Sequence, residues 1–358
     1  MSTFARSSAQ AVPGTVHMIS GCRDKQTSAD ASNTASFELP ADAGPGGAGG
    51  ACTSSMMKVL LGDGAEAVSW VSLLERMRTI LEDGGYTQVP QLSSSRQLSL
   101  SAPFSVVNEG ETGCGSRALG RKRALLIGIN YVGQQGELRG CHNDVETMGQ
   151  YVATQGFDDV KVLLDDGICE SPTFDAIVSG FAWLTDGAAE GDSLFLHYSG
   201  HGGSVPDASG DERDGRDETL VPLDFKTKGQ ITDDLVLSNL VLAVPKGAML
   251  TAVIDACHSG TVLDLPYQFV ASAESLSQVH SGALPDQMQE SPDFNFGQLL
   301  RVGKMLQQMM QDGASKQEIA QAALGGLKSS GALEAAKDAL AEYTAGGGGK
   351  GACPCGVQ

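Results

Sequence analysis

The chain lacks any run of about 18 or more apolar residues, the length that predicts a membrane-spanning helix. It is also short of basic residues, with 24 Lys and Arg against 43 Asp and Glu and a formal net charge of −19. Nucleic acids and anionic membranes are bound through clustered Lys and Arg, so this balance argues against both as partners and favours cationic ligands. The N-terminal stretch MSTFARSSAQAVPG has no apolar core of a secretory signal. We therefore expect a soluble cytoplasmic protein, with a plastid or another organelle left open as its address.

The cysteines also lack the dense, regular spacing that is typical of a disulfide framework. The eight cysteines stand at positions 22, 52, 114, 141, 169, 257, 353 and 355. A chain of 358 residues can bury a large core without disulfides, so we expect mostly reduced thiols. Cys353 and Cys355 form a CxC pair behind the glycine run 346–349, which favours a flexible tail over 346–358 rather than a metal site.

Strand and helix patterns alternate between residues 120 and 260. Buried-strand patterns lie at 124–131, 159–164, 193–199 and 249–256, and helical patterns separate them at 144–156, 172–184 and 233–244. This alternation predicts an α/β fold with a mostly parallel central sheet flanked by helices. In such sheets, ligands bind beyond the carboxyl ends of the strands.

Two of these strands run into polar clusters that contain glycine, HYSGHGG (197–203) and DACHSG (255–260). Because parallel strands end at the same sheet edge, we expect His201 and Cys257 to meet there. A thiol beside an imidazole can become a nucleophilic thiolate, and glycines allow backbone N–H groups, such as those near Gly202 and Cys257, to approach an oxyanion. A buried structural cysteine is the alternative for Cys257 taken alone. The sequence names no third group that would orient His201.

His197 and His201 are four residues apart, a spacing that on a helix would resemble a metal-binding pair. The extended run before them and the glycines after them argue against a helix, so zinc is a minor alternative. His197 lies inside the strand pattern, and we expect a structural role for it.

Together with GINYVGQQGELRGCHNDV (128–145), the two clusters resemble the p20 region of metacaspases, cysteine peptidases with the caspase-hemoglobinase-like fold. In caspases, too, the catalytic His lies about 50 residues before the Cys. The resemblance implies a Cys257–His201 dyad that cleaves after Arg or Lys, whereas caspases cleave after Asp. It also implies a substrate pocket formed by Cys141, Asp144, Ser199 and Asp255. Two carboxylates fit a guanidinium, although the helix dipole alone would favour an acid at position 144.

The resemblance further implies activation by Ca²⁺, bound through Asp217, Asp233, Asp234 and Asp264. Calcium prefers several oxygen ligands from flexible carboxylates, but these positions do not have EF-hand spacing. The neighbouring acidic run Asp211, Glu212, Asp214, Asp217 and Glu218, taken alone, is typical of a solvated loop.

The segments that resemble the smaller p10 region come first, at 19–30, 49–61 and 86–96, which is the order of type III metacaspases. We expect their strands to join the sheet beside the strand that precedes Cys257. The predicted divisions are a p10-like region (1–96), a linker (97–120), a p20-like catalytic region (121–270), a C-terminal helical extension (271–345) and the tail (346–358).

The sequence thus predicts a monomeric, calcium-dependent cysteine endopeptidase that acts on protein or peptide substrates with Arg or Lys at the P1 position. Two alternatives remain open at this point. One is a non-catalytic, calcium-responsive scaffold with the same fold, and the other is a peptidase that cleaves after Asp.

Overall fold

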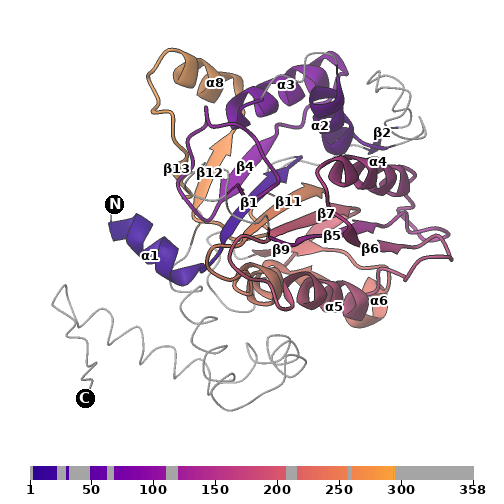
Figure 1. Cartoon of the computed structure of the whole chain (residues 1–358). Coiled ribbons are helices and arrows are strands. Elements are labelled where there is room, and N and C mark those ends of the chain that lie inside the picture. Colours follow the sequence, from indigo (N-terminus) through magenta and orange to yellow (C-terminus); the bar gives the residue numbers. More distant parts are fainter. Residues whose placement is uncertain are drawn as a thin grey trace, which may run out of the picture.

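The computed structural model describes residues 3–21, 30–31, 49–62, 68–109, 120–206, 216–256, 260–292 and 294. Its central feature is an eight-stranded sheet in the order β13-β12-β4-β1-β11-β7-β5-β6, with helices on both faces (Figure 1). In chain order, the strands of this sheet are β1 (Thr15–Ser20), β4 (Gln91–Ser94), β5 (Lys122–Gly128), β6 (Asp159–Leu164), β7 (Ser193–Ser199), β11 (Met249–Asp255), β12 (Tyr267–Val270) and β13 (Gln289–Glu290).

Strands β1, β11, β7, β5 and β6 pair in parallel, whereas β4, β12 and β13 are added through antiparallel pairings. Two small sheets complete the described strands. One contains β8 (Gly202–Pro206), β9 (Arg216–Leu220) and β10 (Ile231–Thr232), and the other pairs β2 (Asp30–Ala31) with β3 (Gly49–Gly50). The predicted α/β fold with a mostly parallel sheet is confirmed.

The helices divide between the two faces of the large sheet. One face carries α2 (Ala51–Leu61), α3 (Trp70–Asp83), α4 (Cys141–Thr154) and α8 (Ala273–His280). The other carries α5 (Phe174–Thr185), α6 (Phe225–Lys228) and α7 (Asp233–Val236), which continues into a π-helical segment, Leu237–Val241. Helix α1 (Thr3–Ala11) lies near the β12 edge, where Phe4 packs edge-on against Tyr267.

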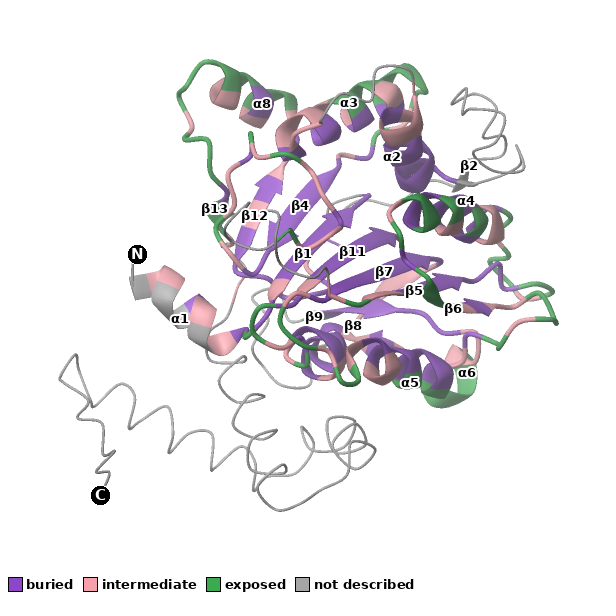
Figure 2. Cartoon of the chain, viewed as in Figure 1, coloured by how far each residue is buried: buried purple, intermediate pink, exposed green. Residues whose placement is uncertain are grey.

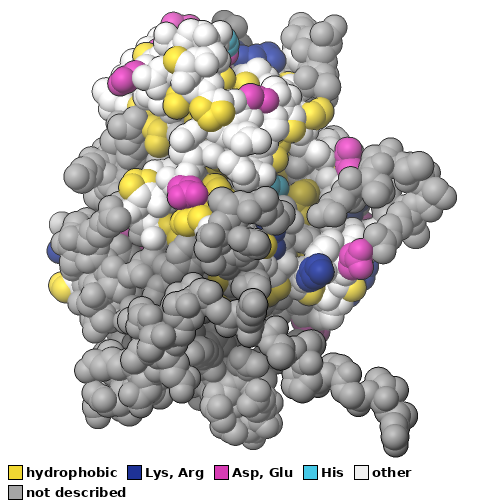
Figure 3. Space-filling view, turned by 90° about the vertical axis from the view of Figure 1, so that its left-hand side faces the viewer, with side chains coloured by type: hydrophobic (Ala, Val, Ile, Leu, Met, Phe, Trp, Pro, Cys, Tyr) yellow, Lys and Arg dark blue, Asp and Glu magenta, His cyan; other side chains and the backbone are white. Residues whose placement is uncertain are grey.

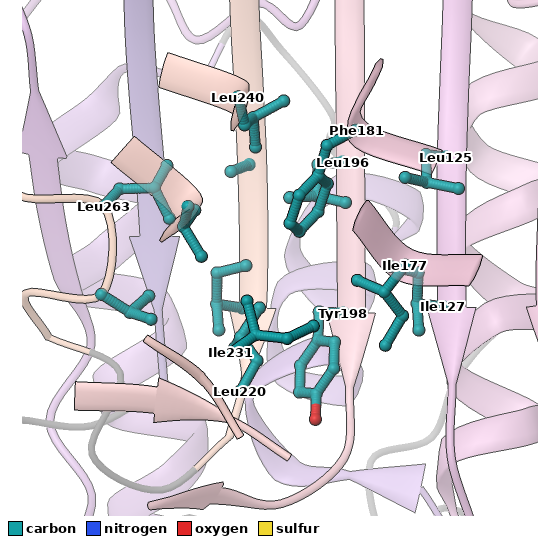
Figure 4. Packing of buried hydrophobic residues seen from close by; sticks show 14 of the residues in the cluster. Leu125, Ile127, Ile177, Phe181, Leu196, Tyr198, Leu220, Ile231, Leu240 and Leu263 are labelled. Atoms are coloured by element: carbon teal, nitrogen blue, oxygen red, sulfur yellow. The ribbon is translucent and has the colours of Figure 1, made fainter. Parts of the chain in front are cut away.

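The central strands are buried on both faces, as Figure 2 shows, which explains why their sequences are almost continuously apolar. Alternate residues of β5 and β7 point to opposite cores. On the α5 side, Leu125 and Leu196 pack with Phe181 and Leu240 in the cluster drawn in Figure 4. On the α2 side, fully buried residues from α2 and α3 fill the other core.

The N-terminal region forms part of the same sheet. Strand β1 pairs with β11 in parallel register from Thr15 opposite Met249 to Ser20 opposite Ile254, as expected for the p10-like strand. Part of the predicted linker also packs here, because Leu100 and Val106 are fully buried in the core on the α2 side.

Several local expectations differ from the structure. The predicted strand 124–131 ends at Gly128, and Tyr131 has a left-handed backbone with φ 53°. The sequence does not predict strands β8 and β9. Glycines begin β8 and charged residues begin β9, and neither kind of residue is typical of a strand. The part of the predicted C-terminal helical extension beyond residue 294 and the predicted tail lie outside the described residues.

In the described part of the chain, no helix is long and apolar enough to cross a membrane. On the face seen in Figure 3, the described Lys and Arg side chains lie apart from one another.

Two buried histidines on the α2 side of the sheet should make stability depend on pH. Burial lowers the pKa of His17 to about 4, with help from Arg96, and burial lowers the pKa of His197 to about 3. Both are therefore neutral when folded but titrate near 6.5 when unfolded. Their contribution is complete above pH 6.5 and is lost as the pH falls towards 4 and 3, by about 2 kcal/mol per histidine between pH 7 and 5.

We expect His197→Gln to flatten the decline of the unfolding free energy between pH 7 and 5, measured by urea titration at each pH. The matched control is His280→Gln, because the His280 side chain is 56% exposed. A His197 variant with the same pH slope as the parent protein would contradict this expectation.

Candidate active site

The two polar clusters lie at adjacent strand ends. Asp255, the last residue of β11, is directly opposite Ser199, the last residue of β7, and the Gly200 N–H donates to the Asp255 carbonyl at 3.3 Å. His201 follows at this edge. The predicted nucleophile Cys257 lies outside the described residues.

The imidazole of His201 is oriented by a backbone carbonyl. Its Nε2 lies 2.6 Å from the oxygen of Gly136. A carbonyl oxygen can only accept, so Nε2 carries the proton and, in the neutral ring, Nδ1 is the atom able to take up another proton. This oxygen is the orienting group that sequence reasoning missed, because a backbone atom has no side-chain signature.

Two tyrosines hold the backbone of His201. The Tyr131 hydroxyl accepts from the His201 N–H at 3.0 Å and donates to the Val221 carbonyl at 2.6 Å, and its ring lies 4.6 Å from the imidazole at 32°. The Tyr198 hydroxyl donates to the His201 carbonyl at 2.8 Å. Burial raises the pKa of both phenols, so they remain protonated donors. Sequence reasoning assigned neither tyrosine a role.

The structure brings three of the predicted pocket residues together. The Ser199 hydroxyl donates to Oδ2 of Asp144 at 2.6 Å, and Asp144 and Asp255 are only 2% and 4% exposed. The fourth, Cys141, is buried one helical turn before Asp144 in α4, and its N–H donates to Oδ1 of Asn130 at 3.1 Å.

Both carboxylates face the amino end of α2. The Gly50 N–H lies 2.9 and 2.8 Å from the two oxygens of Asp144, and the Thr53 N–H donates to Oδ2 of Asp255 at 2.8 Å. A Cβ at Gly50 would lie 2.1 Å from Oδ2 of Asp255 and 2.8 Å from Oδ2 of Asp144. The two acids therefore converge on Gly50, where the helix dipole favours negative charge.

The four predicted calcium residues come from one strand, one helix and one connecting segment. Asp217 is on β9, Asp233 and Asp234 open α7, and Asp264, with φ 48°, follows β11. All four are buried. Burial, and then the charges of Asp264, Asp234 and Asp217, raise the pKa of Asp233 well above its ordinary value, so these acids lie near one another.

The donor chemistry of these acids fits a hard cation, because buried carboxylates of like charge repel one another until a cation neutralises them. Asp233 already accepts from the N–H groups of Glu218 and Asp234, both at 2.8 Å. Among the described residues, no three His, Cys, Asp or Glu side chains are arranged as a complete metal site. The other acids of the run, Asp211, Glu212 and Asp214, lie outside the described residues.

Comparison with known proteins finds a family profile and several relatives that match this chain. The profile described as "Metacaspase, peptidase C14 domain" matches residues 122–266. "Metacaspase III c" of Phaeodactylum tricornutum is 45% identical over 276 residues, which cover 75% of this chain and 79% of that protein. The match to this relative is longer than the profile match, so it includes residues outside 122–266.

Other relatives match a shorter part of the chain. "Metacaspase-1" of Mycosarcoma maydis is 49% identical over 157 residues, and "Metacaspase-1" of Pyricularia oryzae is 48% identical over 162 residues. These alignments cover 43% and 44% of this chain but only 39% and 41% of the fungal proteins. Among solved structures, a protein from Geobacter sulfurreducens is 27% identical over 55% of this chain and 67% of that chain, with a TM-score of 0.33.

Proposed function

The chain belongs to the metacaspase family of C14 cysteine peptidases, and from this premise we propose that it is a calcium-dependent endopeptidase that cleaves peptide bonds after Arg or Lys. The observation that carries the proposal is the convergence of Asp144 and Asp255, two buried carboxylates, at the strand ends that lead to His201 and Cys257. Its natural substrates are proteins or peptides with a basic P1 residue.

In the proposed reaction, Cys257 attacks the scissile carbonyl as a thiolate. Because Gly136 holds the Nε2 proton of His201, Nδ1 receives the thiol proton and then delivers it to the leaving amine. Water hydrolyses the resulting thioester and restores the thiol. The stacking of Tyr131 and the two tyrosine hydrogen bonds keep the imidazole in position through these steps.

The proposed P1 preference follows from charge. Asp144 and Asp255 offer carboxylate oxygens from α4 and β11, and a guanidinium can bind such oxygens through two parallel hydrogen bonds. Since the N–H groups of Gly50 and Thr53 already contact these acids, the start of α2 forms one wall of the proposed pocket. The same negative charge disfavours an acidic P1 side chain, which argues against cleavage after Asp.

Asp217, Asp233, Asp234 and Asp264 are the residues that would hold calcium. The ion would supply positive charge that neutralises their repulsion. Asp264 belongs to the segment that continues from Cys257 to β12, and Asp217 is on the strand next to β8, which begins directly after His201. These acids are therefore connected through the chain to both members of the proposed dyad.

The test of the proposal is an assay of fluorogenic peptides that end in Arg, Lys or Asp, with and without calcium, beside Cys257→Ala. Calcium-dependent release after Arg or Lys that is lost in Cys257→Ala is the expected result. Release only after Asp would overturn the proposed specificity. Calcium binding without release from any peptide would favour the non-catalytic scaffold.

Asp233→Asn should separate calcium binding from folding. The amide oxygen can still accept from one of the two N–H groups that bind Asp233, and the loss of the other bond is offset by the relief of repulsion among the four acids. We therefore expect the thermal stability without calcium to stay near that of the parent protein. The calcium concentration for half-maximal activity should rise about tenfold or more. Thermal unfolding and activity are measured over a calcium titration.

The matched control is Asp175→Asn, because Asp175 is 69% exposed and pairs only with Lys228 among its described charge partners. This variant should keep the parent calcium response. A parent-like calcium response in Asp233→Asn would remove Asp233 from the proposed site.

A further inference from the structure

We propose that Asp165 is a positioning residue for the reaction. Its carboxylate fixes the turn at Tyr131, and Tyr131 in turn holds His201. This inference rests on the proposed peptidase function and adds to it a residue outside the strand-end clusters. Asp165 directly follows the edge strand β6, two strands away from the strand that leads to His201. It acts through Tyr131 and not on the substrate.

The carboxylate of Asp165 holds both sides of Tyr131. Oδ1 accepts from the Asn130 N–H at 2.8 Å and Oδ2 accepts from the Val132 N–H at 3.1 Å. Between them, Tyr131 adopts a φ of 53°, a left-handed conformation that non-glycine residues keep only when their surroundings hold them in it. The Asp165 side chain is 4% exposed, so water competes little for these bonds.

His142 supports the carboxylate from the side of α4. Its Nε2 lies 2.6 Å from Oδ1 of Asp165, and the ring nitrogen must donate because the carboxylate can only accept. Although burial opposes it, the bonds from His142, Asn130 and Val132 lower the pKa of Asp165. The group therefore stays ionised over the pH range in which a cysteine peptidase would work.

The turn that Asp165 holds contacts His201 at two places. The first is the Tyr131 side chain, through its ring and hydroxyl. The second is Gly136, whose carbonyl orients the imidazole, in the same loop. That loop closes on itself, because the Gln134 N–H donates to the Tyr131 carbonyl at 2.9 Å and the Leu138 N–H donates to the Asn130 carbonyl at 2.7 Å. A shift at Asn130 would therefore reach both contacts.

The adjacent Asp166 offers a matched control. It is also a carboxylate, but it accepts from the N–H groups of Ile168 and Cys169, both at 2.8 Å, and from the Cys169 side chain, all within its own exposed turn. These hydrogen bonds do not reach the loop 130–138, which contacts His201. Asp165 and Asp166 are thus adjacent residues of the same type, but only Asp165 binds the backbone on both sides of Tyr131.

The experiment compares Asp165→Asn with Asp166→Asn in the full chain. The side-chain amide introduced by Asp165→Asn would place an NH₂ group against one of the backbone N–H donors, so we expect kcat for an Arg peptide to fall about tenfold or more with KM within about twofold. Asp166→Asn should match the parent protein. A parent-like kcat in folded Asp165→Asn would overturn the proposal.

A second readout does not require peptidase activity. The rate at which iodoacetamide alkylates Cys257 is measured against pH, because this profile reports how His201 supports the thiolate. We expect a shifted profile for Asp165→Asn and an unchanged one for Asp166→Asn. If the parent protein cleaves no peptide, the proposed function fails, whereas the alkylation profile still decides the role of Asp165. An unchanged profile in Asp165→Asn overturns that role.

Tyr131→Phe covers the case in which Asp165→Asn does not fold. It removes only the hydroxyl and should also lower kcat and shift the alkylation profile. Where both variants fold, the double variant should lose little more than the stronger single variant, because both changes act through one turn. Fully additive losses, or a parent-like Tyr131→Phe, would contradict the proposed connection.

Discussion

Gly50→Ala is expected to reduce kcat/KM for an Arg peptide about 100-fold or more while the protein remains folded. The new methyl carbon would lie 2.1 Å from Oδ2 of Asp255 and 2.8 Å from Oδ2 of Asp144. Either the carboxylates or the start of α2 must move, and both form the proposed pocket. Overpacking of this kind costs about 1–3 kcal/mol of stability, which a large domain with this core can tolerate.

The measurement combines kcat/KM, the thermal midpoint and alkylation of Cys257, which does not use the P1 pocket. Gly149→Ala is the matched control, because this glycine lies on α4, the helix that carries Asp144, and its Cβ would make only a 3.5 Å contact with Leu126. Alanine there favours the helix and should leave cleavage unchanged. Cleavage at the parent rate in folded Gly50→Ala would place the P1 pocket elsewhere.

Asp255→Asn should lower kcat/KM for an Arg peptide by a comparable factor, because it removes a charge and not because it adds volume. Asparagine keeps an oxygen that can accept from the Thr53 N–H but removes the buried negative charge, so one ion pair to the P1 guanidinium is lost. Removing one partner of a buried charge pair costs several kcal/mol, which predicts a fall in kcat/KM of about 100-fold or more for Arg and Lys peptides.

Alkylation of Cys257 by iodoacetamide should persist in Asp255→Asn, which separates loss of P1 binding from loss of the nucleophile. Asp286→Asn is the control, because Asp286 is an exposed acid that accepts from Ser99 and the N–H of Ser101. It should cleave like the parent protein. Equal activity of Asp255→Asn on Arg peptides would exclude Asp255 from the pocket.

The two variants also distinguish what each residue does. If Gly50 only shapes the pocket, Gly50→Ala should weaken cleavage after Arg and after Lys. If Asp255 supplies charge, its loss should weaken the Arg peptide more than the Lys peptide, because only the planar guanidinium can form two parallel hydrogen bonds. A Gly50→Ala protein that prefers Lys would show that the pocket was reshaped and not closed.

Much of the arrangement could be predicted from local patterns. The strands at 193–199 and 249–256 were expected within one residue of β7 and β11, because long apolar runs with flanking polar clusters are read directly along the chain. Parallel strands end at one edge, so the proximity of Ser199 and Asp255 also followed. The strand expected at 124–131 continued too far, because the left-handed turn at Tyr131 depends on Asp165, which is remote in sequence.

The sequence by itself determined the α/β class, the family resemblance and the residue types available for chemistry, because side-chain identity and periodicity are local properties. Only the tertiary structure decided which backbone atoms those residues meet. Gly50 contacts Asp144 across 94 residues and Thr53 contacts Asp255 across 202, and Gly136 orients His201 through a carbonyl. Backbone N–H and C=O groups are the same at every residue, so their roles emerge only when packing brings distant segments together.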